Sequence, residues 1–170
     1  PELTILYHII SNKCYNMKRK WGIKLKNIIV GQSGGPTAVI NSSVAGLYKQ
    51  AKKLKINKIY GMVHGIEGFL EENIIDLDKY LNNKENYELL KRTPSAFLGS
   101  CRYKLPPIND DENTYKKIFE ILEKYEIDGF FYIGGNDSMD TIKMLSDYAK
   151  EHNKKQKFIG IPKTVDNDLP

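Results

Sequence analysis

Cysteine is scarce in this sequence: its 170 residues include only Cys14 and Cys101. Two isolated cysteines cannot form a disulfide framework or a structural zinc site, because both need several cysteine or histidine residues at characteristic spacings. We therefore expect a protein of a thiol-reducing compartment, with the cytoplasm as the default location.

The sequence also lacks a hydrophobic run long enough to cross a bilayer. The apolar stretch at residues 3–10 is far shorter than the roughly 20 residues that a membrane helix needs. It has no charged segment before it and no small-residue cleavage site after it, so it is not typical of a secretory signal. We expect no membrane partner.

Nucleic-acid-binding motifs are missing as well, although the formal net charge is +5. Lysines cluster at residues 18–26 and 49–58, but neither an aromatic-interleaved RNA motif nor a zinc-finger spacing accompanies them. The second cluster falls at the end of a predicted helix, where cations complement the helix dipole. We expect no nucleic-acid partner.

From Lys26 onward, short β-branched runs alternate with longer segments of helical periodicity. This alternation favours an α/β fold with a mostly parallel sheet and helices on both faces, in which ligands bind at the carboxyl ends of the strands. The predicted strands are 27–30, 57–63, 74–77, 129–133 and 158–161, and the predicted helices are 36–54, 84–91, 111–125 and 138–151.

The chain is predicted to have two parts, because the alternating pattern begins only at Lys26. Residues 1–25 are expected to be an N-terminal extension that need not belong to the native structure, with Met17 as a candidate start. Residues 26–170 are expected to form one domain. Because the chain begins with Pro1 and stops at Pro170, directly after a dense polar segment, we expect a truncated N-terminal domain whose smaller second domain is missing.

Two glycine-rich segments, residues 31–37 and 134–140, each join a predicted strand to a predicted helix. Adjacent glycines let backbone N–H groups approach an anion closely, beside a favourable helix N-terminus. The first segment matches neither the dinucleotide fingerprint nor the P-loop. The alternatives are a plain tight turn for the first, and for the second simple helix capping by Asn136 or Ser138.

A third segment, residues 162–168, places Asp166 and Asp168 beside Lys163 in a loop that leaves a strand. Two carboxylates so close together are costly to assemble unless something binds there. A phosphoryl-transfer site needs such parts: a base for the acceptor hydroxyl, cations for the phosphates and carboxylates for Mg²⁺. The alternative is a solvated Asp-Asn turn.

A fourth segment, residues 97–102, ends in Arg102 after a Leu-Gly-Ser turn. A guanidinium there could bind phosphates through two parallel hydrogen bonds. A single surface arginine is more often just solvated, so this segment carries little weight alone.

Together and in this order, the four segments closely resemble the phosphofructokinase family, from about Lys26 to Pro170. The most specific parts are Gly-Gly-Asn-Asp-Ser at 134–138 and Pro-Lys-Thr-Val-Asp-Asn-Asp at 162–168. The resemblance implies a glycolytic phosphotransferase that phosphorylates fructose 6-phosphate at its 1-hydroxyl, with Mg²⁺ as cofactor. It also implies a homo-oligomer of the full-length protein and a donor-binding role for residues 26–170.

The resemblance further assigns roles to individual residues. It implies that Asp166 is the base, and that Arg102 and Lys163 bind and stabilise phosphates. The donor-binding set is Gly34, Gly35, Arg102, Gly135, Asn136, Asp137, Ser138 and Lys163. The substrate contacts are Thr164, Val165 and Asp166, and the metal ligands are Asn136 and Asp168.

Two positions bear on the phosphoryl donor. ATP-dependent members of the family have a small residue where Asp137 stands, and this side chain would crowd a nucleotide and repel its α-phosphate. They also have glycine where Lys163 stands. Both positions resemble the pyrophosphate-dependent branch, so we expect pyrophosphate as donor, with ATP as the alternative.

Two rival functions follow from other features. Asn136 replaces an aspartate that the family uses to hold Mg²⁺, which motivates a non-catalytic, phosphofructokinase-like binding subunit. Lipid kinases and nicotinamide-dinucleotide kinases share a Gly-Gly-Asp-Gly-type turn, but they lack the segment at 162–168.

Overall fold

Side chains of the central strand alternate between two hydrophobic layers. In the computed structural model, which describes residues 25–164, Ile28 and Val30 of β1 (Asn27–Gln32) belong to one buried cluster. Ile29, between them, belongs to another. The sheet is therefore buried on both faces, as parallel sheets of α/β proteins are.

Five strands form the sheet in the order β3-β2-β1-β4-β5. β1 pairs in parallel with β2 (Lys58–Met62) and with β4 (Ile127–Gly134), and β4 pairs in parallel with β5 (Lys157–Pro162). The predicted mostly parallel sheet is confirmed, and each strand lies within two residues of its predicted bounds.

The edge strand β3 (Ile74–Asp76) is antiparallel to β2, which the sequence did not predict. Residues 63–73 connect the two strands, and parallel neighbours need a crossover of about a dozen residues or more. A connection of this length instead lets the chain turn back along the edge of the sheet.

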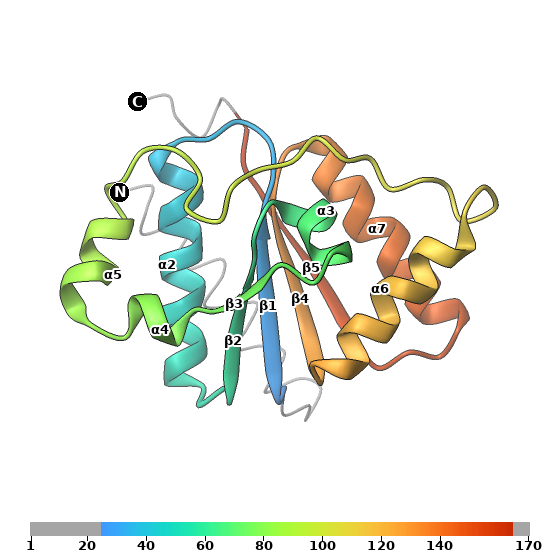
Figure 1. Ribbon diagram of the computed structural model, residues 1–170, viewed down its shortest axis with the longest axis horizontal. Helices are drawn as coiled ribbons and strands as arrows, with labels where there is room; N and C mark the ends of the chain where they lie inside the picture. Colours follow the sequence, from blue (N-terminus) through green and yellow to red (C-terminus); the bar gives the residue numbers. More distant parts are fainter. Residues whose placement is uncertain (1–24, 165–170) are drawn as a thin grey trace.

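Helices cover both faces of the sheet, as predicted (Figure 1). α2, α4 and α5 pack against the face with Ile28, and α3, α6 and α7 pack against the face with Ile29. The bounds are α2 Ala38–Lys53, α3 Gly65–Leu70, α4 Asp78–Leu81, α5 Lys84–Leu90, α6 Glu112–Lys124 and α7 Asn136–Glu151. Within the described residues, none of these helices could span a membrane.

The starts of two predicted helices need correction, and two short helices were not predicted. α7 begins at Asn136 rather than Ser138. α2 begins at Ala38 rather than Pro36, with Thr37 as its extended N-cap residue. The short helices α3 and α4 were not predicted, because six and four residues are too few to establish a helical period.

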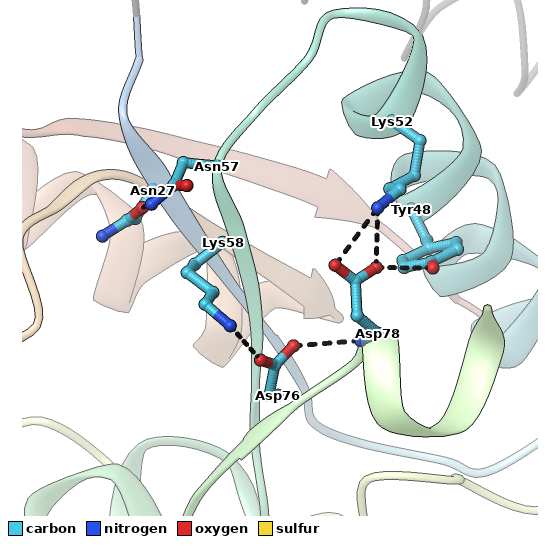
Figure 2. A network of polar contacts seen from close by, with 7 residues as sticks. All are labelled: Asn27, Tyr48, Lys52, Asn57, Lys58, Asp76 and Asp78. Carbon is cyan, nitrogen blue, oxygen red and sulfur yellow. Dashed lines mark hydrogen bonds and ion pairs between the residues drawn. The ribbon is translucent and has the colours of Figure 1, made fainter.

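A polar network fixes the connection from β3 to α4 against β2 and α2 (Figure 2). Lys58 binds one carboxylate oxygen of Asp76 at 2.7 Å, and the other oxygen accepts the backbone N–H of Asp78 at 3.0 Å. The carboxylate of Asp78 in turn accepts hydrogen bonds from the hydroxyl of Tyr48 at 2.6 Å and from Lys52 at 3.0 Å. These bonds hold the antiparallel edge of the sheet in place.

The connections of β1 and β4 separate at the carboxyl edge of the sheet. α2, which follows β1, lies on one face, and α7, which follows β4, lies on the other. The backbone N–H of Ser33 still donates to the carbonyl oxygen of Ile133 at 2.8 Å, so the two loops diverge from adjacent points. Such a switch point is where open α/β sheets bind ligands.

Candidate active site

The loops after β1, β4 and β5 meet at this edge, at the top of Figure 1. The ammonium of Lys163 donates to the carbonyl oxygen of Gly35 at 3.2 Å, and its backbone N–H donates to the carbonyl oxygen of Gly134 at 2.9 Å. A Cβ atom built on Gly34 would lie 3.8 Å from the nitrogen of Gly135, and one built on Gly135 would lie 3.8 Å from the oxygen of Lys163. The three loops are thus in mutual contact.

Lys163 provides a buried cation at this meeting point. Lys163 is 6% exposed, and an ammonium group removed from water is tolerated only when it has hydrogen-bonding partners. The carbonyl oxygen of Gly35 is one of them. The positive charge therefore lies directly behind a glycine loop whose backbone is exposed.

The start of α7 presents unused hydrogen-bond donors to the same edge. Gly135 is the N-cap residue and no side chain caps the helix, so capping by Asn136 or Ser138 is wrong: both residues lie inside the first turn. The N–H of Ser138 donates to the carbonyl oxygen of Gly135 at 3.1 Å, but the first two N–H groups of the helix, those of Asn136 and Asp137, have no acceptor within it. Together with the helix dipole, they favour an anion.

Side chains of the predicted donor-binding set differ in accessibility. Arg102, Asn136 and Asp137 are exposed at this edge. Ser138 is 3% exposed and packs against Gly134, so it contributes to the turn more than to an open surface. Arg102 forms no ion pair within residues 25–164.

The segment that carries Arg102 crosses the same edge between α5 and α6 (Figure 1). The hydroxyl of Ser100 donates to the carbonyl oxygen of Gly34 at 2.9 Å. Gly99 has φ of +73°, and a Cβ atom there would lie 2.5 Å from Nδ1 of His64. Only glycine allows both this backbone conformation and this close approach.

Two buried amides, Gln32 and Asn41, tie that segment to β1 and α2. Both residues are 0% exposed. The side chain of Gln32 donates to Oδ1 of Asn41 at 2.9 Å and accepts the N–H of Leu98 at 2.8 Å.

Oδ1 of Asn41 also accepts the N–H of Phe97 at 2.8 Å, and its amide nitrogen donates to the carbonyl oxygens of Thr93 and Ser95 at 2.9 and 2.8 Å. A fully bonded buried network of this kind fixes one arrangement of the backbone. It therefore fixes the path of the chain that leads to Arg102.

A tyrosine lies beneath the site. The hydroxyl of Tyr132 accepts the N–H of Ile66 at 3.2 Å and lies 3.6 Å from Sγ of Cys101. Burial raises the pKa of Tyr132 far above its usual range, and the proximity of Cys101 adds to this effect. Tyr132 is therefore a neutral structural support and not a proton acceptor.

The substrate and metal predictions fall mostly beyond the described part of the chain. Thr164 is exposed, directly after Lys163. Val165, Asp166 and Asp168 lie outside the described residues. Among the residues that are described, no group of three or more histidine, cysteine, aspartate or glutamate side chains is arranged to hold a metal.

Sequence reasoning missed Lys104 and the two buried amides. The ammonium of Lys104 lies 3.2 Å from Oδ1 of Asp137, a contact between a loop and a helix that no local pattern reveals. Asn41 carried a usable signal, because a polar amide stands within the apolar face of a predicted helix and such a residue needs a tertiary partner. Gln32 carried a similar one, at the end of a buried strand.

This chain is similar to known proteins over most of its length. The model of the phosphofructokinase family matches residues 27–170. A pyrophosphate–fructose 6-phosphate 1-phosphotransferase of Rhodospirillum rubrum is 42% identical over 143 residues, which cover 84% of this chain and 34% of that protein. An ATP-dependent 6-phosphofructokinase of Actinobacillus pleuropneumoniae is 32% identical over 146 residues, which cover 86% and 41%.

Among solved structures, a pyrophosphate-dependent phosphofructokinase from Nitrosospira multiformis superposes with a TM-score of 0.75 at 41% identity. The match covers 85% of this chain and 35% of that one. The chain spans about a third of the length of the pyrophosphate-dependent relatives that it matches.

Proposed function

The chain belongs to the phosphofructokinase family, and we propose that the complete protein transfers a phosphoryl group from pyrophosphate to the 1-hydroxyl of fructose 6-phosphate. The contact between Lys163 and Gly35 supports this proposal most directly. It holds a cation behind a glycine loop, beside the uncapped start of α7. A compact polyanion would be bound there by charge and backbone N–H groups, with no need for an adenosine moiety.

Asp137 supports pyrophosphate over ATP as the donor. Its side chain is 65% exposed in the first turn of α7, two residues after Gly135, which lies near the loops after β1 and β5. A carboxylate in that position occupies space that a nucleotide would need, so its bulk disfavours ATP. The more similar relatives are named as pyrophosphate-dependent, whereas the ATP-dependent relative is less similar.

In the proposed reaction, Asp166 takes the proton of the sugar 1-hydroxyl. The resulting oxygen attacks a phosphorus atom of pyrophosphate, the bridging P–O bond breaks, and inorganic phosphate leaves. Lys163 and Arg102 bind and stabilise the phosphoryl oxygens, while Gly34, Gly35 and Gly135 present backbone N–H groups. Positioning and charge stabilisation supply most of the catalysis in such transfers.

The residues of this site could hold Mg²⁺ only together with phosphate oxygens of the bound donor. Asn136 offers one exposed amide oxygen, and Asp137 is already paired with Lys104, so Asp168 is the favoured carboxylate ligand. A set this small suits Mg²⁺, which keeps several waters and is carried largely by substrate phosphates. Bound there, the ion would neutralise charge on the donor oxygens.

Thr164 and Val165 contact fructose 6-phosphate beside Asp166, and the remaining sugar-phosphate contacts come from outside this chain. The complete enzyme acts in the cytoplasm as a homo-oligomer.

A coupled assay of the full-length protein with fructose 6-phosphate and each donor in turn tests the proposal. We expect turnover with pyrophosphate and Mg²⁺, and a kcat for Asp166→Asn lower by about 10²–10⁴-fold, the range for a lost general base. An unchanged thermal unfolding midpoint would show that the variant is folded. Turnover with ATP but not with pyrophosphate would refute pyrophosphate as the donor. Turnover of Asp166→Asn within a few-fold of wild type would refute Asp166 as the base.

A further inference from the structure

Lys104 lies two residues after Arg102 in an extended segment that joins the site to α6. Residues of this segment alternate between the core and the surface: Cys101 and Leu105 are buried, Tyr103 packs against the same cluster, and Arg102 and Lys104 are exposed. Residues two apart in an extended chain point to the same side. The inward residues therefore present Arg102 and Lys104 together at the surface.

Lys104 meets the carboxylate of Asp137 on that side. Its ammonium lies 3.2 Å from Oδ1, and the two side chains are 75% and 65% exposed. Since Lys104 reaches the first turn of α7, the outward side of the segment faces the donor loops. Arg102 is exposed two residues before Lys104 in the same segment.

The charge of Asp137 creates a difficulty for any anionic donor. A carboxylate that excludes a nucleotide by its size also carries a charge that repels pyrophosphate, because like charges repel. The ammonium of Lys104 is positioned to remove that repulsion while leaving the bulk of the carboxylate in place.

We infer that Lys104 is a specificity-determining residue for the donor: it neutralises Asp137, so that this carboxylate excludes a nucleotide without repelling pyrophosphate. This role presupposes the proposed function and deepens it. It also distinguishes Lys104 from Lys163 and Arg102, which act on the phosphates themselves.

A double-mutant cycle on the full-length protein tests this role, with the KM for pyrophosphate as its readout. Lys104→Met should raise this KM by about tenfold, because it leaves the Asp137 carboxylate uncompensated beside an anion site. In the Asp137→Asn background, the same substitution should change KM by less than about twofold, since no charge remains to be neutralised. The effect of Lys104→Met should also shrink between about 0.05 M and about 0.5 M salt, because exposed charges are screened.

Lys150→Met is the matched control. Lys150 is 74% exposed and lies 3.3 Å from Oδ1 of Asp147, so the control removes the same charge from a similar ion pair at the other end of α7. The KM for pyrophosphate should stay within about twofold of wild type, because charges this far apart are screened.

Two results would overturn the role of Lys104 while leaving the proposed function intact. One is a KM unchanged by Lys104→Met. The other is an equal rise in both backgrounds, which would make Lys104 a direct phosphate ligand. A wild-type protein without pyrophosphate-dependent turnover would instead refute the proposed function, and the role of Lys104 with it.

Discussion

The ammonium of Lys163 donates a hydrogen bond to the carbonyl oxygen of Gly35 at 3.2 Å, although the two residues lie 128 positions apart in the chain. This contact joins the loop after β5 to the loop after β1 across the switch point of the sheet. It fixes a cation relative to exposed backbone, and charge fixed in advance costs little reorganisation when a polyanion binds.

Lys163→Met should separate this electrostatic role from packing. Methionine fills nearly the same buried volume, so the thermal unfolding midpoint should change little. The kcat/KM of the full-length protein for pyrophosphate should fall by about 10²–10³-fold, the range for one lost preorganised donor. A decrease of less than about threefold would show that the ammonium of Lys163 does not act on the donor.

Gln32→Met should lower activity by disturbing the support of Arg102. The substitution leaves the buried N–H of Leu98 without its acceptor, which costs about 1–3 kcal/mol. We expect the kcat/KM of the full-length protein to fall by about tenfold or more, because small displacements of a catalytic group are costly.

Gln50→Met provides the comparison for Gln32→Met. Gln50 is also buried in this domain, at 6% exposure, but it belongs to the C-terminal half of α2 and bonds no residue of the segment at 93–102. Its substitution should affect the unfolding midpoint more than kcat/KM. Equal losses of activity in both variants would contradict a positioning role for Gln32.

Tyr48→Phe should produce a pH-dependent loss of stability. Burial favours a raised pKa for Asp78, but the hydrogen bonds from Tyr48 and Lys52 outweigh it, so the pKa lies below the ordinary value of 3.8. A carboxyl group with a lowered folded-state pKa stabilises the fold above its unfolded-state pKa, and this contribution is lost as the pH falls through the folded-state pKa.

The loss caused by Tyr48→Phe should therefore be about 1 kcal/mol at neutral pH and should shrink once Asp78 is protonated. Thermal unfolding midpoints of both forms from pH 7 downward measure it. Tyr80→Phe, which removes a hydroxyl from a half-exposed ring packed on Phe97, should show no such trend. If the midpoints of wild type and Tyr48→Phe differed by the same amount at every pH, this would contradict the proposed coupling to Asp78.

The sequence predicted those elements whose local pattern is strong. The apolar stripe of residues 111–125 matched α6, Glu112–Lys124, to within one residue at each end. The short helices α3 and α4 carry too few residues to establish a period. The direction of β3 depends on the length of its connection to β2, which single-strand patterns do not contain.

The candidate site likewise has features that local sequence patterns predict and features that depend on tertiary contacts. The meeting of Gly35, Gly135 and Lys163 at one edge of the sheet was predictable, because their segments combine unusual residues within a few positions directly after predicted strands. The pair of Lys104 and Asp137 was not, since it depends on how the segment before α6 crosses the sheet. The bonds from Asn41 to the backbone at Thr93 and Ser95 likewise exist only in the folded chain.

Hydrogen–deuterium exchange of the full-length protein, with and without saturating pyrophosphate, tests most directly whether the loops form one polyanion site. We predict slower exchange of backbone amides in three segments at once, residues 33–37, 99–104 and 134–138, because one ligand contacts all three. Exchange in residues 84–92, which comprise α5 and the two residues after it, should be unaffected. Protection confined to one of the three segments, or absent from all of them, would contradict the account.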